Sequence, residues 1–116
     1  MEIQLIFEET TLSARLDDTV AARSFYDSLP LELTLTDYAS TEKISDLAKA
    51  LPVQSEPKGY QPKAGDITYY APWGNLAIFY KNFGYASGLV RLGEISDDIQ
   101  LLRKSGLLNV WIEATQ

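Results

Sequence analysis

Strict alternation of apolar and polar residues is the feature that most restricts how this chain can fold. Leu12, Ala14 and Leu16 alternate with polar neighbours, and the same two-residue period recurs over 31–36 and 108–112. Successive side chains of a β-strand point to opposite faces, so this pattern predicts strands with one buried face. We expect seven strands, at 3–8, 11–17, 31–36, 66–70, 76–80, 89–95 and 107–114.

Short helical signals fall between the predicted strands. Asp18 or Thr19 suits the N-cap of a helix over 20–29, which Pro30 would end. Apolar residues at helical spacing predict a second helix over 44–51. A third helix is expected to begin at Ser96 and to end before a glycine at position 106.

These elements predict a single mainly β domain over 1–116. Seven or more strands with two or three short helices favour a compact, closed antiparallel β-barrel, because closure leaves no strand edge exposed. Helices following the second and sixth predicted strands would cover its open ends. Residues 52–64 contain three prolines and neither period, so they form either a lid-like functional loop or a surface excursion that covers a sheet edge.

The composition excludes several classes of function. The chain has no cysteine and no histidine, which rules out disulfides, thiolate metal sites and both Ser-His-Asp and Cys-His catalysis. A net charge of −6 with scattered basic residues argues against a nucleic-acid partner. No apolar run approaches the ~20 residues that span a bilayer. We expect a cytoplasmic monomer or small homo-oligomer that binds neither nucleic acid nor membrane and uses no cofactor or metal.

Three stretches together resemble a known family. They are LPLELTLTDYASTEKISDL at 29–47, GYQPKAGDITYYAPWGNLAIFYKNFGY at 59–85 and GLVRLGEI at 88–95. The chain is similar here to bacterial and archaeal cyclophilin-like fold proteins, which are relatives of the cyclophilins. The resemblance implies a barrel of about eight strands capped by helices, and it brings no assigned activity.

The cyclophilins themselves are peptidyl-prolyl isomerases, and the resemblance stops short of their chemistry. Their activity depends on an arginine on the strand after the first helix, because a cation near the prolyl amide lowers a rotation barrier of about 18–20 kcal/mol. The corresponding strand here, 31–36, contains no arginine. The pocket histidines of the cyclophilins have no counterpart either.

Aromatic residues are concentrated between Tyr60 and Tyr85, which include eight of the thirteen in the chain. They either line a concave pocket for an apolar or proline-containing ligand or fill the barrel, and the pattern does not say which strand face points inward. Residues on turns and loops are better candidates for exposure than those on strands. The candidate ligand-binding residues are Tyr38, Glu42, Lys43, Tyr70, Trp73, Asn75, Phe79, Phe83 and Tyr85.

Charged residues offer two readings near the start of the predicted 44–51 helix. Lys43 is the one cation between Arg23 and Lys49, so it would supply the charge that the missing arginine supplies in cyclophilins. Alternatively, Glu42 and Lys43 form a solvated pair at the helix start. The adjacent carboxylates at 8–9, 17–18 and 97–98 are explained by solvation and helix capping, and predict neither acid–base catalysis nor a metal site.

The sequence therefore favours a non-catalytic cyclophilin-like domain that binds a peptide segment or small organic ligand in an aromatic groove. The alternative is a weak or divergent peptidyl-prolyl isomerase that uses Lys43 or tyrosine hydroxyls. A third hypothesis is a metabolic accessory domain that acts with a separate partner.

Overall fold

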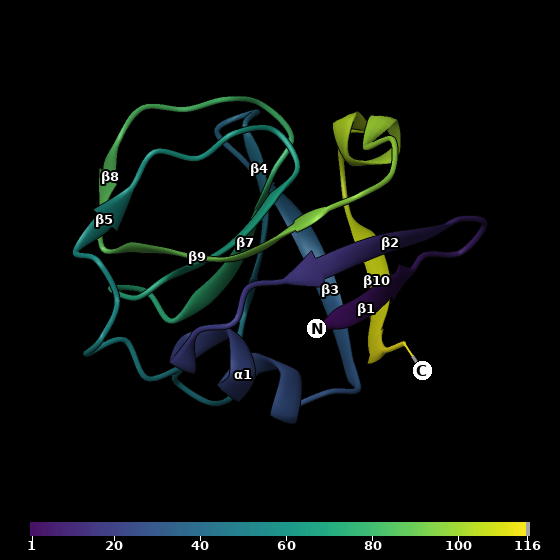
Figure 1. Ribbon diagram of the computed structural model, residues 1–116. Helices are drawn as coiled ribbons and strands as arrows, with labels where there is room; N and C mark the ends of the chain where they lie inside the picture. The colour runs from purple at the N-terminus through teal and green to yellow at the C-terminus, as the bar shows by residue number, and fades with distance from the viewer. Residues whose placement is uncertain (116) are drawn as a thin grey trace.

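The computed structural model describes residues 1–115, which form the predicted closed antiparallel β-barrel (Figure 1). In chain order the elements are β1 Glu2–Ile6, β2 Thr11–Leu16, α1 Val20–Asp27, β3 Leu31–Tyr38, β4 Glu42–Asp46, β5 Gly59–Tyr60, β6 Asp66–Tyr70, β7 Asn75–Phe79, β8 Ala86–Ser87, β9 Leu89–Ile95, the 3₁₀ helix η1 Gln100–Arg103, and β10 Leu108–Ala114. Eight strands close the barrel in the order β1-β10-β3-β4-β7-β6-β9-β2. The mainly β, eight-stranded prediction is confirmed.

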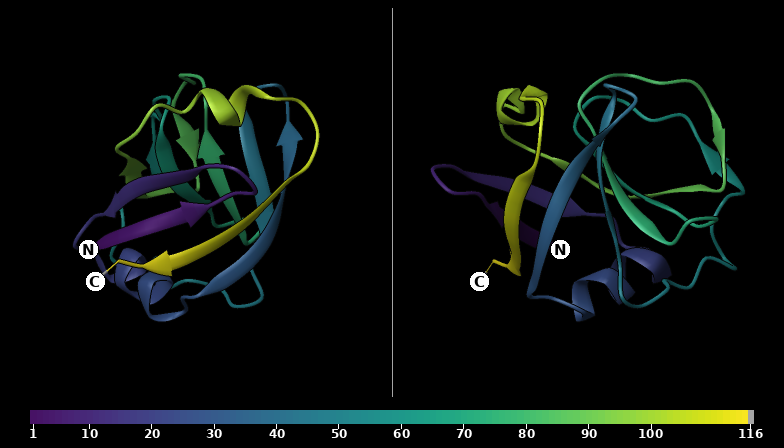
Figure 2. Two further views of the ribbon diagram at one scale, coloured as in Figure 1. Left: turned by 90° about the vertical axis from the view of Figure 1, so that its right-hand side faces the viewer. Right: turned by 180° about the vertical axis from the view of Figure 1, so that it is seen from behind.

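Helical segments lie at the two ends of the barrel, as predicted. Thr19 is the N-cap of α1, and its hydroxyl accepts a hydrogen bond from the Ala22 amide. Phe25 of α1 and Leu102 of η1 are both fully buried against the barrel core. Figures 1 and 2 show α1 at the end of the barrel near both chain termini and η1 at the opposite end.

The predicted helix over 44–51 is wrong, because its first part is strand β4. This strand pairs with β3 on one side and with β7 on the other, so it supplies the eighth strand of the barrel. Its two-residue period is hidden in the sequence, because the residue that it turns into the barrel is Lys43 and not an apolar one. Apolar residues beyond the strand then gave a false helical spacing.

The third predicted helix is also shorter than expected. It is the single 3₁₀ turn η1, and Ser96 does not cap it. Instead, the Asp98 carboxylate accepts a hydrogen bond from the Gln100 amide, while Asp97 accepts one from the amide of Ser13 on β2. These two hydrogen bonds fix the backbone just before η1. Gly106 follows η1 and has a positive φ of 91°.

Both faces of the β6–β7 hairpin are covered, and two separate apolar clusters show which side chains face into the barrel. Tyr69, Ile78 and Tyr80 belong to the main core inside the barrel. Phe79 belongs to a second cluster on the outside, and Tyr70 packs against that cluster. The small β5–β8 sheet contributes Tyr60 and Ala86 to this outer cluster, and β4, β7 and β9 contribute its other members.

The segment 52–64 is tied to the loop after β7 as well as to β8. The Phe83 amide donates to the Pro62 carbonyl at 3.1 Å, and the Gly88 amide donates to the Lys58 carbonyl at 2.7 Å. Figure 1 shows β5 and β8 standing at one side of the barrel, away from β1 and β10. This segment and the β8 loop together form one lobe outside the barrel wall, beside β6, β7 and β9.

Candidate functional site

A cavity of about 220 Å³ opens on the outside of the barrel, between the wall and the β5–β8 lobe, and we call it the outer pocket. Strands β3, β4, β6, β7 and β9, the turn after β6 and the loop before β8 all contribute to it. Its lining residues are Tyr38, Glu42, Tyr70, Trp73, Asn75, Phe79, Phe83, Ala86 and Leu89. Seven of the nine residues predicted to bind ligand therefore come together around one cavity.

Three aromatic rings form one end of the outer pocket. Trp73 meets Tyr38 with ring centroids 5.6 Å apart and Tyr70 with centroids 5.3 Å apart, and the interplanar angle is 84° in both pairs. Edge-to-face packing of this kind fixes the three side chains relative to one another. Trp73 nevertheless remains 56% exposed, so much of its ring surface is free to contact a ligand.

A second pair of rings lies toward the other end. Phe79 and Phe83 stack with centroids 6.3 Å apart and an interplanar angle of 29°. Phe79 is buried on β7, whereas Phe83 is half exposed on the loop before β8. The outer pocket is thus an aromatic-walled cavity whose rim is formed by exposed side chains.

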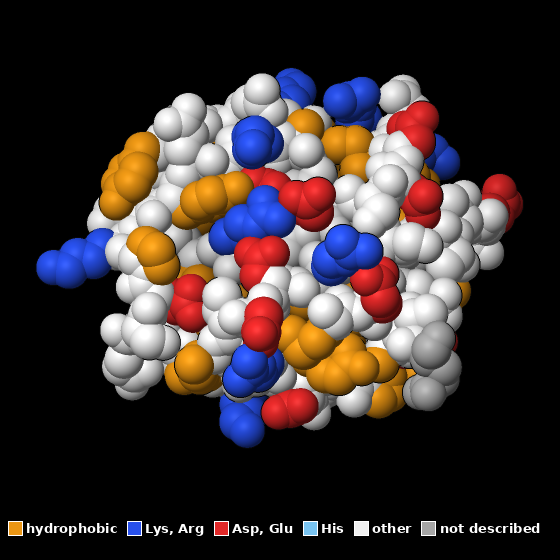
Figure 3. Space-filling model, in the orientation of Figure 1, with side chains coloured by type: hydrophobic (Ala, Val, Ile, Leu, Met, Phe, Trp, Pro, Cys, Tyr) orange, Lys and Arg blue, Asp and Glu red, His pale blue; other side chains and the backbone are white. Residues whose placement is uncertain are grey.

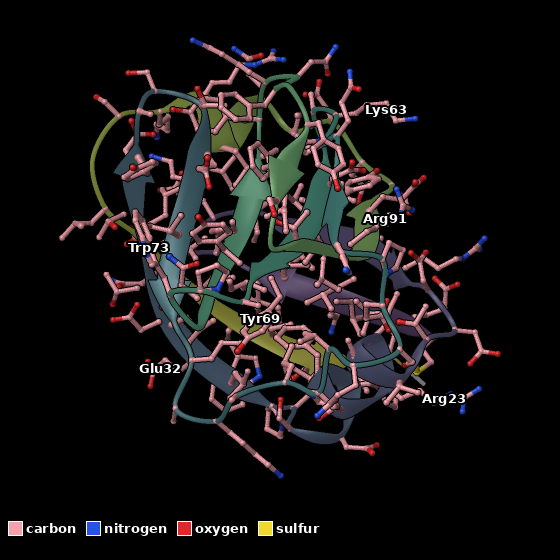
Figure 4. The ribbon with its side chains drawn as sticks, turned by 90° about the vertical axis from the view of Figure 1, so that its left-hand side faces the viewer. Arg23, Glu32, Lys63, Tyr69, Trp73 and Arg91 are labelled. Atoms are coloured by element: carbon pink, nitrogen blue, oxygen red, sulfur yellow. The ribbon has the colours of Figure 1, made fainter. Side chains whose placement is uncertain are left out.

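Local sequence explains why the aromatic residues reach this position. Tyr70 ends β6 and Phe79 ends β7 on the outer parity of the hairpin, opposite Tyr69 and Ile78. The turn between the strands closes at Gly74, whose φ of 68° is the left-handed conformation that glycine adopts readily. Figure 4 shows Trp73 near the outer edge of the molecule at this turn, while Tyr69 lies within the barrel.

Gly88 lets the β5–β8 lobe approach the turn between β6 and β7 closely. A Cβ at this position would lie 2.8 Å from the Pro72 ring, and the residue has a φ of 86°. The Ala71 amide donates to the Gly88 carbonyl at 2.9 Å. Glycine at this point therefore brings the lobe and the turn together along one side of the outer pocket.

Glu42 is the charged side chain of the outer pocket. Burial raises the pKa of its carboxyl from 4.5 to about 7. The described residues provide no ion pair or hydrogen bond to that carboxylate that would offset the loss of water. Its cross-strand neighbours are Tyr38 on β3 and Phe79 on β7, so aromatic residues flank the carboxylate on both sides.

Asn75 places a second unsatisfied polar group in the same cavity. Its side chain is 2% exposed, and its amide oxygen Oδ1 has no hydrogen-bond partner. Within residues 1–115 no other buried side-chain nitrogen or oxygen is left without a partner. A buried polar atom without a partner costs about 1–3 kcal/mol, so such atoms are uncommon unless a ligand or water satisfies them.

Lys43 does not line the outer pocket, and its interpretation as a solvated helix-start residue is wrong. It is fully buried inside the barrel, where Nζ donates to the carbonyls of Lys104 and Gly106 at 2.6 and 3.0 Å. Nζ also lies 3.3 Å from the Asp37 carboxylate and 5.9 Å from the Tyr80 ring centroid. Because strand side chains alternate, Lys43 faces away from the cavity that Glu42 faces.

Tyr85 also lies outside the cavity lining. Its ring packs over Gly59 so closely that a Cβ on that glycine would overlap the phenol. The side chain remains 64% exposed on the β5–β8 lobe. Tyr85 therefore belongs to the outer surface of the lobe.

Arg91, which the sequence analysis did not single out, organises a polar cluster on β9. Its guanidinium pairs with Asp17, Asp66 and Glu94 at 2.8, 3.0 and 2.7 Å. The Tyr60 hydroxyl donates to Asp66 at 2.6 Å, which ties β5 of the lobe to the same cluster. An arginine inside the otherwise apolar run LVRLG was the available signal.

A larger hollow of about 510 Å³ lies elsewhere, between the β1–β2 turn, η1 and β10. Glu8, Glu9, Glu32 and Trp111 contribute to its lining. The described residues hold no orphaned buried side-chain atom there and no group of three acidic side chains that could bind a metal ion. Figure 3 shows acidic and basic side chains interspersed over the face drawn, without a single basic patch.

In the part of the chain that the structure describes, no helix is both long and apolar enough to cross a membrane. The longest, α1, has eight residues.

The fold is a closed, mainly β barrel of eight strands with an aromatic-lined cavity on its outer wall. The model of the Cyclophilin-like family matches residues 5–113, and the chain belongs to that family. Its fold is also similar to the solution structure of a hypothetical protein from Archaeoglobus fulgidus. That match has a TM-score of 0.74 and 19% sequence identity, and it covers 99% of this chain and 95% of the other. None of the curated proteins matches the chain.

Proposed function

We propose that this protein is a non-catalytic binding domain that holds one side chain of a peptide, or a small organic molecule, in the outer pocket. The observation that carries the proposal is the convergence of five aromatic side chains, a carboxylate and an orphaned amide on one cavity. Aromatic walls with a few placed polar groups are the usual composition of a ligand site.

The size of the cavity limits the ligand. Its volume of about 220 Å³ is below the ~300–1,000 Å³ typical of pockets for drug-sized molecules. One amino-acid side chain or a small head group fits such a space, whereas a folded partner would contact only its rim. The exposed rings of Trp73, Tyr38 and Phe83 surround the opening and offer that contact.

The same geometry weakens the isomerase alternative. Lys43 is held by two carbonyls and a carboxylate inside the barrel, so it does not supply a cation to the outer pocket. Arg91 is engaged with three carboxylates and is not part of the pocket lining. The remaining polar groups of the cavity are a carboxylate, an amide, an indole N–H and phenols, and none of them carries the positive charge that a twisting prolyl amide requires.

The test is an NMR titration of ¹⁵N-labelled protein with proline-containing peptides and a panel of small metabolites. Binding at the outer pocket is expected to shift the signals of Trp73, Asn75 and Phe83. Trp73→Ala should abolish these shifts, whereas Trp111→Ala, which removes the other tryptophan, should leave them intact. Shifts that cluster instead around Glu32 and Trp111 would place the binding site in the larger hollow and contradict the proposal.

A protease-coupled proline-isomerisation assay separates binding from catalysis. The proposal expects wild-type protein and the Tyr70→Phe variant to show the same background rate. A wild-type rate well above background, reduced in Tyr70→Phe, would favour the divergent isomerase instead.

A further inference from the structure

The outer pocket carries charge of one sign only, and that sign is negative. Among the residues that line it, Glu42 is the single charged side chain, and no lysine or arginine contributes to the lining. The chain as a whole carries a net charge of −6, so long-range attraction also favours a positively charged ligand. An anionic ligand would meet the carboxylate without any cation to hold it.

Aromatic rings surround the position that a cation at Glu42 would occupy. Tyr38 and Phe79 are the direct cross-strand neighbours of Glu42, and Phe83 stacks on Phe79. The faces of aromatic rings attract ammonium ions, and the attraction is stronger where water is excluded. A carboxylate between such rings is the arrangement expected of a receptor for an organic cation.

We infer that the outer pocket takes an alkylammonium ion, carried by a lysine side chain or by a free amine, with Glu42 as its counter-ion. This inference rests on the proposed binding function and names the chemical class of its ligand. The ammonium donates to the Glu42 carboxylate, and the alkyl chain lies against the rings of the pocket wall.

Asn75 defines the other end of the ligand. It pairs with Asp46 across β4 and β7, while Glu42 pairs with Phe79, so the two polar residues are four residues apart along the strands. That separation corresponds to about 13–14 Å of backbone. The orphaned Oδ1 of Asn75 is an acceptor available to a second N–H donor of the ligand.

The experiment compares two probes that differ only in the terminal ammonium group. Nα-acetyl-lysine-N-methylamide carries the ammonium, and Nα-acetyl-norleucine-N-methylamide has the same backbone and an alkyl chain without it. Binding is followed by the indole signal of Trp73. Putrescine and n-butylamine, added separately, distinguish a free-amine ligand from a peptide-borne one by which probe binds more tightly.

We expect the lysine probe to bind at least about tenfold more tightly than the norleucine probe. Glu42→Gln should reduce that ratio to within about twofold, while the matched control Glu32→Gln, in the other hollow, should leave it unchanged. Equal affinities of the two probes in the wild-type protein would overturn the inference but leave the binding proposal standing. If none of the probes, and none of the peptides and metabolites named above, moves the Trp73 signal, both fail.

Discussion

The neighbouring residues Glu42 and Lys43 of β4 lie on opposite sides of the barrel wall, and they differ in whether their charges have partners. Lys43 points into the barrel and has three oxygen partners within 3.3 Å. Glu42 points into the outer pocket, and burial raises the pKa of its carboxyl to about 7. Oxygen atoms inside the barrel therefore pair with the Lys43 ammonium, whereas no group in the outer pocket pairs with the Glu42 carboxylate.

This difference separates polar groups whose hydrogen bonds and ion pairs stabilise the fold from polar groups that have no partner in the protein. Thr68, fully buried on β6, donates its hydroxyl to the Ala77 carbonyl at 2.7 Å, while Asn75 on the next strand has an amide oxygen without a partner. Polar groups that stabilise the native state have their partners already. Groups that lack them reduce stability until something binds, so loss of such a group should spare the fold.

The largest expected effect is at Lys43. Lys43→Met should lower the free energy of unfolding by about 3–4 kcal/mol, because it leaves Asp37 and two carbonyls without their buried cation. Urea unfolding followed by circular dichroism measures the loss. A loss below about 1 kcal/mol would remove the contrast with Glu42.

Substitution of Arg91 should cause the second-largest loss in the free energy of unfolding. Arg91→Met is expected to cost about 2 kcal/mol, because Asp66 is 3% exposed and would lose its cation. Arg15→Met is the matched control, since Arg15 pairs with Glu2 on the exposed surface and its loss should leave the free energy of unfolding nearly unchanged. Equal losses in the two variants would show that the Arg91 cluster does not hold the lobe to the barrel.

Substitution of Glu42 should raise the free energy of unfolding, whereas substitution of Lys43 or Arg91 lowers it. A carboxyl whose pKa rises from 4.5 unfolded to about 7 folded binds its proton more tightly in the native state, so wild-type stability falls as pH rises through that range. Solvent screening of this half-exposed side chain limits the loss to about 1 kcal/mol. Glu42→Gln should remove that slope and be more stable than wild type at pH 8. An unchanged slope in the variant, by urea unfolding between pH 4.5 and 8, would contradict a desolvated Glu42.

The smallest expected effect is at Asn75. Asn75→Leu should change the free energy of unfolding by less than about 0.5 kcal/mol, because no hydrogen bond to Oδ1 is lost and most residues that line the cavity with it are aromatic or aliphatic. Thr68→Val is its control and should cost about 1 kcal/mol, since it deletes a buried hydrogen bond. Equal costs in thermal unfolding would mean that Asn75 is a structural residue.

The strands and the barrel could be predicted because their cause is local. Alternation in 11–17, 31–36 and 107–114 places apolar side chains on one face whatever the rest of the chain does, and closure then follows from the need to protect edges. The resemblance to the cyclophilin-like family supplied the eighth strand that alternation did not reveal. That strand was missed because Lys43 occupies its inward position, and only the carbonyls after η1, about sixty residues away, make a lysine acceptable there.

The candidate site was predictable in part for the same reason. Turn chemistry predicted that Trp73 is exposed, whereas the aromatic density between Tyr60 and Tyr85 was compatible with either a pocket wall or a filled barrel. The inward or outward parity of Tyr69 and Tyr70 could not be predicted, because apolar residues occupy both faces of the hairpin. Tyr85 is exposed, as expected for a loop residue, but its place outside the outer pocket could not be predicted, because its packing against Gly59 depends on the pairing of β5 with β8, two strands of two residues each.

The free energy of unfolding of the Glu42→Gln/Asn75→Leu double variant at pH 8 tests the central contrast most directly. The two residues lie far apart along the strands, so their effects should add. The double variant is predicted to be more stable than the wild type by about 1 kcal/mol, because Glu42→Gln removes a desolvated charge and Asn75→Leu deletes no hydrogen bond to Oδ1. A double variant less stable than the wild type by 1 kcal/mol or more would show that they belong to the structure instead.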